Sequence, residues 1–207
     1  MLPTTMPDSC TQVNVAAPFL LTSLLLDTLP ENGRILNVAS ISAGSTIDFN
    51  NLQMVRALQH PAGPANGACI STTCRTCRWC MHFNNLQMEK GFSAHSSYSL
   101  SKLANIIFNM KLVKRLSAAG KGITANTCDP GTVNTKMLLA GWGPCGIPVH
   151  EANDEHWIIT DPSLEGVTGQ YFVGRRPCRP PSTALEESIQ QKLWTHLEEQ
   201  TGAQWSI

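Results

Sequence analysis

The sequence is poor in charge, and its acidic and basic residues balance. Only 14% of its 207 residues are charged, whereas soluble domains usually carry about 25%. Lysine plus arginine and aspartate plus glutamate both count 15, so nothing in the net charge favours nucleic acid or an anionic membrane. With 42% hydrophobic residues the chain can still bury a core, and its low charge is compatible with surface hidden in a homodimer.

The sequence also lacks a long uninterrupted apolar run. Its most apolar stretch, residues 13–29, contains Asn14, Pro18 and Asp27 and is too short and too polar to span a bilayer. The first residues lack the basic cluster that opens a signal peptide. We therefore expect a cytoplasmic protein without a membrane span, in which the eight cysteines would mostly be free thiols.

What the sequence does contain is alternating helical and strand patterns. Apolar residues recur at helical spacing over 12–29 and 97–119, and again from a predicted capping box, Thr183 with Glu186, to Gly202. Pro18 would kink the first of these helices or mark its first turn. Short apolar runs at 34–40, 123–127 and 170–173 are typical of buried parallel strands. This order predicts an α/β fold with a parallel sheet.

One hexamer, Phe-Asn-Asn-Leu-Gln-Met, occurs twice, at residues 49–54 and 83–88. Two copies are too few for a solenoid. Removing residues 55–88 would join Met54 to Glu89 and leave a continuous α/β pattern. We therefore interpret 55–88 as an insertion, a duplicated or mis-spliced junction, within one domain that spans 1–207.

Four cysteines lie inside that insertion, at Cys69, Cys74, Cys77 and Cys80. Four thiolates this close together could bind zinc or an iron–sulfur cluster, which would make the chain a metal-binding module. The spacing matches no standard two-pair zinc site, and a chance-translated segment explains the cysteines as well. We therefore predict no metal site.

Tyr98 and Lys102 form a Tyr-x-x-x-Lys pair on a predicted helix, where residues four apart share a face. A phenol alone is a poor acid–base group at neutral pH, but a neighbouring ammonium stabilises its phenolate form. The pair could then exchange a proton with a substrate hydroxyl or carbonyl. Alone this motif is weak, because two ordinary surface residues would match it.

The surrounding motifs resemble those of the short-chain dehydrogenase/reductase family, over about residues 11–54 and 89–202. NVAS at 37–40 resembles the end of the family's fifth strand, and HSSYSLSKLAN at 95–105 resembles its active-site helix. DPGTVNT at 129–135 resembles the loop after the sixth strand, and VN at 13–14 the site of the catalytic asparagine.

The spacing between the catalytic motifs identifies a branch of this family. Ser40 and Tyr98 are 58 residues apart (98 minus 40), which is too far for the family. Without the 34 residues of 55–88 the spacing becomes 24, which resembles the retinol-dehydrogenase-like branch. The phrase FNNLQ also resembles that branch.

The resemblance implies four catalytic residues. Ser40 would hydrogen-bond the reacting oxygen, and Tyr98 would be the acid–base group. Lys102 would stabilise the phenolate and hold the cofactor ribose, and Asn14 would hold a water that links Lys102 to solvent. Each residue also has a structural reading, such as a strand-end serine at Ser40 or a helix cap at Asn14.

The resemblance further implies an incomplete Rossmann-like doubly wound sheet and a nicotinamide cofactor, with NADP slightly favoured over NAD. Tyr98 and Lys102 would contact this cofactor, Pro130-Gly131 would lie against the nicotinamide, and Thr135 would contact its carboxamide. Pro130-Gly131 could equally be a plain turn. The implied activity interconverts an alcohol and a carbonyl, and the branch suggests lipophilic substrates.

The sequence departs from the family in two places. The family opens with about three βα units, roughly 90 residues, the first of which carries a glycine-rich turn for the cofactor phosphates. Here Gly131, Gly141, Gly143 and Gly146 all follow Tyr98, so that cofactor-binding part is expected to be missing. The strand at 34–40 would then form an exposed edge. Residues 148–163 are short and polar, so we also expect the family's helix there to be lost.

These departures keep a second hypothesis open. The chain could be a catalytically inactive truncated product or splice form. It could then pair with a full-length relative through its two long helices, which resemble the family's dimer-forming pair.

Overall fold

The computed structural model describes residues 9–43 and 94–207. The predicted insertion at 55–88 and the cysteines Cys69, Cys74, Cys77 and Cys80 lie outside the described residues. Within the described part of the chain, no group of histidine, cysteine or carboxylate side chains could hold a metal ion.

The described residues form an open sheet of four strands in the order β1-β2-β3-β4. Strands β1 (Arg34–Val38), β2 (Thr124–Asp129) and β3 (Tyr171–Val173) are parallel. Strand β4 (Arg176–Cys178) pairs antiparallel with β3 across a tight turn. The three parallel strands confirm the expected α/β class. Strand β4 was not expected, because its side chains are all exposed and carry no buried-strand pattern.

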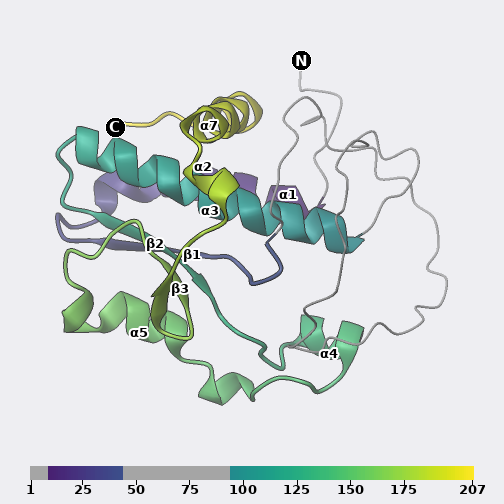
Figure 1. The fold of residues 1–207 in the computed structure, drawn as a ribbon. Coiled ribbons are helices and arrows are strands. Elements are labelled where there is room, and N and C mark those ends of the chain that lie inside the picture. Colours follow the sequence, from purple (N-terminus) through teal and green to yellow (C-terminus); the bar gives the residue numbers. More distant parts are fainter. Residues whose placement is uncertain (1–8, 44–93) are drawn as a thin grey trace, which may run out of the picture.

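Helices cover both faces of this sheet (Figure 1). The long helix α3 (Ala94–Ala118) crosses one face, with α2 (Ala17–Leu25) and α7 (Glu187–Thr201) on the same side, and α5 (Asp154–Thr160) lies on the other. The shorter elements are α1 (Ser9–Thr11), η1 (Gln12–Ala16), η2 (Leu26–Thr28), α4 (Lys136–Trp142), η4 (Val149–Glu151), η5 (Pro162–Leu164) and α6 (Ser182–Leu185). None of the described helices is long and apolar enough to cross a membrane.

The core lies between α3 and the elements packed on it. The α3 side chains Leu103, Ile106 and Ile107 are fully buried against this core. An aromatic cluster joins three elements and the C-terminal segment, since the rings of Phe19, Phe108, Trp194 and Trp205 all lie within 6.2 Å of one another, centroid to centroid. Helix α7 therefore covers the side of α3 that faces away from the sheet.

Two helix predictions need correction at their ends. The predicted helix over 12–29 is divided, because Gln12–Ala16 forms a π-helical turn and Pro18 follows it in the first turn of α2. The predicted capping box is wrong, since Thr183 lies inside α6 and the extended backbone of Glu186 separates α6 from α7. Gly202 ends α7 in the left-handed conformation, as predicted (φ 65°).

The expectation that the helix within 148–163 is lost is also wrong, because α5 occupies this segment. Ile158 is buried in a small cluster with Cys128 and Phe172, and the Trp157 ring meets Phe172 edge-on. The guanidinium of Arg34 donates to the carbonyls of Ile158 and Ile159, which the end of α5 leaves without a partner inside the helix, and to the carbonyl of Asp161 just beyond it. A distant arginine thus completes a helix that its own polar sequence does not predict.

Strand β1 forms an edge of the sheet within the described residues, where β2 is its one neighbour. This agrees with the expectation that residues 34–40 form an edge strand.

Candidate functional site

The predicted site residues gather at the carboxyl edge of the sheet. Strands β1 and β2 run parallel with Val38 paired to Cys128, so Ser40 and the turn at Pro130-Gly131 leave the sheet side by side. In open α/β sheets, ligands bind outside the carboxyl ends of the strands. This edge is therefore where a ligand site is expected.

Helix α3 presents Tyr98 and Lys102 on one face, as their spacing predicts. The Lys102 Nζ lies 5.6 Å from the centroid of the Tyr98 ring. It also donates a 2.9 Å hydrogen bond to the carbonyl of Val38, the last residue of β1. Burial of the amine lowers the pKa of Lys102 below its usual range. The ammonium is thus fixed between the predicted acid–base tyrosine and the strand that leads to Ser40.

Asn14 reaches this helix through a serine that the sequence reasoning did not single out. The Asn14 side chain donates to Ser101 Oγ at 2.9 Å, and the Ser101 hydroxyl donates to the backbone carbonyl of Tyr98 at 2.7 Å. Asn14 lies inside the π-helical turn η1 and does not cap a helix. The two hydrogen bonds fix η1 against the turn of α3 that carries Tyr98.

Two further asparagines on α3 were also missed. Asn105 Nδ2 donates to the Val38 carbonyl at 3.4 Å. Asn109 accepts from Asn37 at 3.0 Å and donates to the Ala125 carbonyl at 3.3 Å. Both are buried, and the i, i+4 spacing of two asparagines inside a long predicted helix is the signal that could have revealed them. They anchor α3 to β1 and β2 just below the site.

Ser40 lies at the edge but makes its hydrogen bond within its own loop. Its hydroxyl accepts from the Ser42 N–H at 3.1 Å. Among the described residues, no hydrogen bond joins Ser40 to Tyr98 or Lys102. The structure therefore brings Tyr98, Lys102 and Asn14 into one connected group and leaves Ser40 beside it.

The loop after β2 is built around Gly131. Asp129 Oδ1 accepts from the Gly131 N–H at 3.0 Å, and Gly131 takes a left-handed backbone with φ 74°. No atom lies within 4 Å of the position that a Cβ would occupy there, so the glycine serves the turn and leaves its surface open. Thr135 caps helix α4, its hydroxyl accepting from the Leu138 N–H at 3.3 Å.

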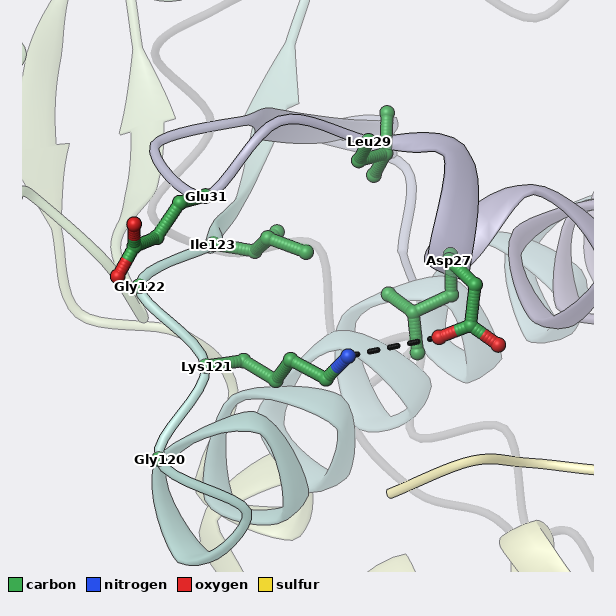
Figure 2. A pocket seen from close by; sticks show the side chains of 8 residues that line it. Asp27, Leu29, Glu31, Gly120, Lys121, Gly122 and Ile123 are labelled. Carbon is green, nitrogen blue, oxygen red and sulfur yellow. Dashed lines mark hydrogen bonds and ion pairs between the residues drawn. The ribbon is translucent and has the colours of Figure 1, made fainter.

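A shallow hollow lies at the opposite, amino edge of the sheet (Figure 2). Lys121 and Asp27 form an exposed ion pair at 3.4 Å beside it. A hydrogen bond from Ser206 lowers the pKa of Asp27. Exposed pairs of this kind add little stability. None of the predicted site residues lines this hollow.

The chain resembles known dehydrogenases over most of its length. It is 34% identical over 195 residues to human retinol dehydrogenase 11, covering 88% of this chain and 50% of that protein. It is 29% identical over 204 residues to human polyprenol dehydrogenase, covering 92% of this chain and 53% of that protein. The chain thus spans about half the length of the curated relatives it matches. No protein-family model matches it.

A solved structure of an uncharacterized protein from Mycobacterium Paratuberculosis shares the fold. It superposes with a TM-score of 0.65 at 21% identity, covering 100% of this chain and 63% of that one. The open, mostly parallel sheet with helices on both faces is a Rossmann-like α/β fold. With the dehydrogenase relatives and the Tyr-x-x-x-Lys pair at the carboxyl edge, the chain belongs to the short-chain dehydrogenase/reductase family, in its retinol-dehydrogenase-like branch.

Proposed function

We propose that this protein is an NAD(P)-dependent oxidoreductase that interconverts an alcohol and a carbonyl. The observation that carries the proposal is the placement of Tyr98 and Lys102, with the Lys102 Nζ 5.6 Å from the phenol ring and bonded to Val38 at the carboxyl edge. A fixed ammonium beside a half-exposed phenol is what proton exchange with a substrate oxygen requires.

The residues at this edge divide the chemistry between them. Tyr98 passes a proton to or from the substrate oxygen, and Lys102 stabilises the phenolate that this leaves. Ser40 turns its hydroxyl from the Ser42 N–H toward the substrate oxygen and stabilises charge as it develops. Asn14 positions Tyr98 through Ser101. A bound nicotinamide would supply or accept the hydride.

The chain offers contacts for the nicotinamide half of a dinucleotide. Gly131 has an open Cα surface at the carboxyl edge, and Pro130 beside it is half-buried. Lys102 and Tyr98 would hold the ribose, and Thr135 would contact the carboxamide. We favour NADP over NAD slightly, on the resemblance to the retinol-dehydrogenase-like branch. These contacts concern the nicotinamide half alone, because no glycine-rich turn for the phosphates lies before Tyr98 within this sequence.

We propose a lipophilic substrate, because the loops at this edge expose large apolar side chains. Ile41, one residue after Ser40, is 73% exposed, and Met137 on α4 is 60% exposed. Ile147, on the loop that follows α4, and Val149, the first residue of η4, are also exposed. Apolar side chains around a site with few polar groups favour an apolar ligand. The relatives named for retinol and polyprenol agree with this proposal.

The test is nucleotide binding followed by turnover of a lipophilic alcohol. We expect saturable binding of NADPH or NADH at micromolar concentration, and turnover that Tyr98→Phe abolishes without unfolding the chain. Tyr171 is the only other tyrosine and lies in β3, so Tyr171→Phe is the matched control and should keep its activity. Unchanged turnover in Tyr98→Phe would refute the proposed role of the phenol.

A second candidate is a catalytically inactive chain that pairs with a full-length relative. Two observations favour it: the chain spans about half of its relatives, and Ser40 bonds within its own loop. Helix α7 covers α3, so pairing would use the outer face of α2, where Leu21 and Leu24 are 57% and 68% exposed. A folded chain that binds neither nucleotide but co-elutes with a relative, and loses this with Leu24→Glu, would favour this candidate.

A further inference from the structure

Asn134 closes the ends of one loop at the carboxyl edge. Its side-chain amide donates to the Gly146 carbonyl at 2.7 Å, and its side-chain oxygen accepts from the Gly146 N–H at 2.8 Å. The backbone adds two bonds, Asn134 N–H to the Ile147 carbonyl and Ile147 N–H to the Thr132 carbonyl, each at 2.9 Å. We call this junction of Asn134 with Gly146 the neck of the loop 135–145.

The neck admits only glycine at position 146. A Cβ at Gly146 would lie 2.4 Å from the carbonyl oxygen of Thr132 and 3.0 Å from the backbone nitrogen of Val133. Backbone atoms cannot move aside as a flexible side chain can. The backbone at residue 146 must come close to that of Thr132 for both Asn134 hydrogen bonds to form. Asn134 at one end of the loop and Gly146 at the other together make this approach possible.

Among its described side chains, the loop beyond the neck has few other contacts. Helix α4 has no buried side chain from Lys136 to Ala140, and only Leu138 is half-buried. Thr135, which caps α4, bonds to Leu138 within the same loop. Figure 1 shows α4 standing apart from the helices that cover the sheet. The position of the loop therefore depends on the neck.

We propose that Asn134 is a positioning residue, which holds Thr135 and α4 at the carboxyl edge through its two hydrogen bonds to Gly146. This inference rests on the proposed function, because Thr135 and the exposed Met137 matter only if a nicotinamide and a lipophilic substrate bind there. Without the neck, the loop is less ordered in the free protein and has to become ordered when a ligand binds. The conformational entropy lost in this ordering weakens the affinity for the ligand.

Asn134→Ala is the test, and Asn126→Ala is its matched control. Asn126 makes the same kind of two-point amide clamp, to the Val167 carbonyl at 2.8 Å and from the Gln170 N–H at 2.9 Å, but inside β2 and away from the loop. Amide hydrogen exchange of residues 135–145, measured without nucleotide, tests the neck by itself. Titration with NADPH then tests what the neck does for binding.

We expect Asn134→Ala to accelerate exchange in 135–145 and to weaken NADPH binding about tenfold, the equivalent of one net hydrogen bond. Asn126→Ala should lower stability without changing either quantity in the folded chain. Unchanged exchange in Asn134→Ala, unchanged NADPH affinity despite faster exchange, or an equal loss of affinity in Asn126→Ala would each overturn the proposal.

Asn134→Asp adds a pH profile that a merely space-filling role would not show. A protonated carboxyl carries one donor and one acceptor, like the amide, whereas the carboxylate repels the Gly146 carbonyl. Protection of 135–145 relative to wild type should therefore recover as the pH falls toward the carboxyl pKa, and a pH-independent difference would count against the neck. If wild type binds neither NADPH nor NADH, the proposed function fails while the exchange data still decide the role of Asn134.

Discussion

Lys102 on α3 and Val38 at the end of β1 are joined by a 2.9 Å hydrogen bond from the lysine ammonium to the strand carbonyl. Asn105 reaches the same carbonyl from one turn further along the helix, at 3.4 Å. This carbonyl therefore sets the distance between the helix that carries Tyr98 and the strand that leads to Ser40. One backbone atom links two of the motifs on which the proposed chemistry depends.

Replacing Lys102 by methionine separates its chemical role from its structural one. Lys102→Met keeps an apolar stem of similar length and leaves Asn105 bonded to Val38, so we expect at least a hundredfold loss of turnover with little loss of stability. Turnover and urea unfolding of the same preparation measure both effects. A parallel collapse of stability and turnover would mean that the ammonium is mainly structural.

The pH dependence of Lys102→Met follows from the lowered pKa of Lys102. At pH values between this lowered pKa and 10.5, Lys102 is protonated in the unfolded chain and neutral in the folded one. The free energy of unfolding of the wild type therefore increases as the pH rises through that window. We expect any stability advantage of Lys102→Met to be largest at neutral pH and to shrink as the pH rises. A constant difference from pH 7 to 10.5 would show that burial does not penalise the amine.

Arg175 offers a prediction in which backbone strain and side-chain contacts oppose each other. It is the one described non-glycine residue with positive φ, at 60°, in the turn between β3 and β4. Its guanidinium bonds to Asp154 at 2.8 Å and to Asn153, and it stacks 5.6 Å from the Trp157 ring centroid. The turn thereby holds the beginning of α5.

Two substitutions of Arg175 separate these effects. Arg175→Ala keeps the strained backbone and loses the contacts, so we expect the free energy of unfolding to fall by about 1 kcal/mol. Arg175→Gly loses the same contacts but relieves the strain, and should stay within about 0.5 kcal/mol of wild type. Chemical unfolding, with the exposed Arg176→Ala as control, measures the order. A glycine variant less stable than the alanine variant would contradict it.

The sequence predicts the parallel strands and the long helix because their apolar patterns are local. Strand β4 escapes prediction because its stability comes from backbone pairing with β3, while its side chains are exposed. Helix α5 escapes because its apolar stripe is short and its last carbonyls are satisfied by Arg34 from a distant strand. In both cases the element is stabilised by contacts with another element, which a local sequence pattern does not reveal.

The candidate site divides in the same way. The i, i+4 spacing of Tyr98 and Lys102 is a local signal, and the structure shows the two residues on one face of α3. The contact of Asn14 with Ser101 spans 87 residues and that of Lys102 with Val38 spans 64, so no spacing rule predicts either. The roles proposed for Ser40, Thr135 and Asn14 in catalysis and cofactor binding stay predictions.

Cys128 should make the protein sensitive to alkali. Its side chain is fully buried in β2, and burial raises the pKa of its thiol from 9.0 to about 12. The folded thiol stays neutral while the unfolded one ionises, so its contribution to stability is complete below pH 9 and is lost as the pH rises toward 12.

Cys128→Ala removes this contribution and should flatten the fall in stability above pH 9. Tyr171, whose pKa burial raises to about 12, contributes a similar fall above pH 10 in both proteins and therefore cancels in the comparison, so the wild-type curve should fall progressively relative to that of Cys128→Ala from pH 9 toward 12. Unfolding free energies across this range, with the exposed Cys178→Ala as control, provide the measurement. Parallel curves for wild type and Cys128→Ala would refute the assignment.

Phe19 on α2 is the ring on which the aromatic cluster is centred. It is fully buried, and its centroid lies 5.3 Å from Phe108, 5.0 Å from Trp194 and 4.9 Å from Trp205. Through these contacts it joins α2, α3, α7 and the C-terminal segment. Because the tryptophans report on their own surroundings, fluorescence follows both the packing and the unfolding of this cluster.

Truncating this ring should therefore destabilise the whole helical layer. We expect Phe19→Ala to cost about 3–5 kcal/mol, a large share of the roughly 5–15 kcal/mol that holds a typical domain folded. Phe19→Leu keeps most of the volume and should cost about 1–2 kcal/mol. Leu24→Ala on the same helix, at a side chain 68% exposed, should change stability by about 0.5 kcal/mol or less. If Phe19→Ala costs no more than Leu24→Ala, α2 is not docked on α3, and the contact of Asn14 with Ser101 loses its support.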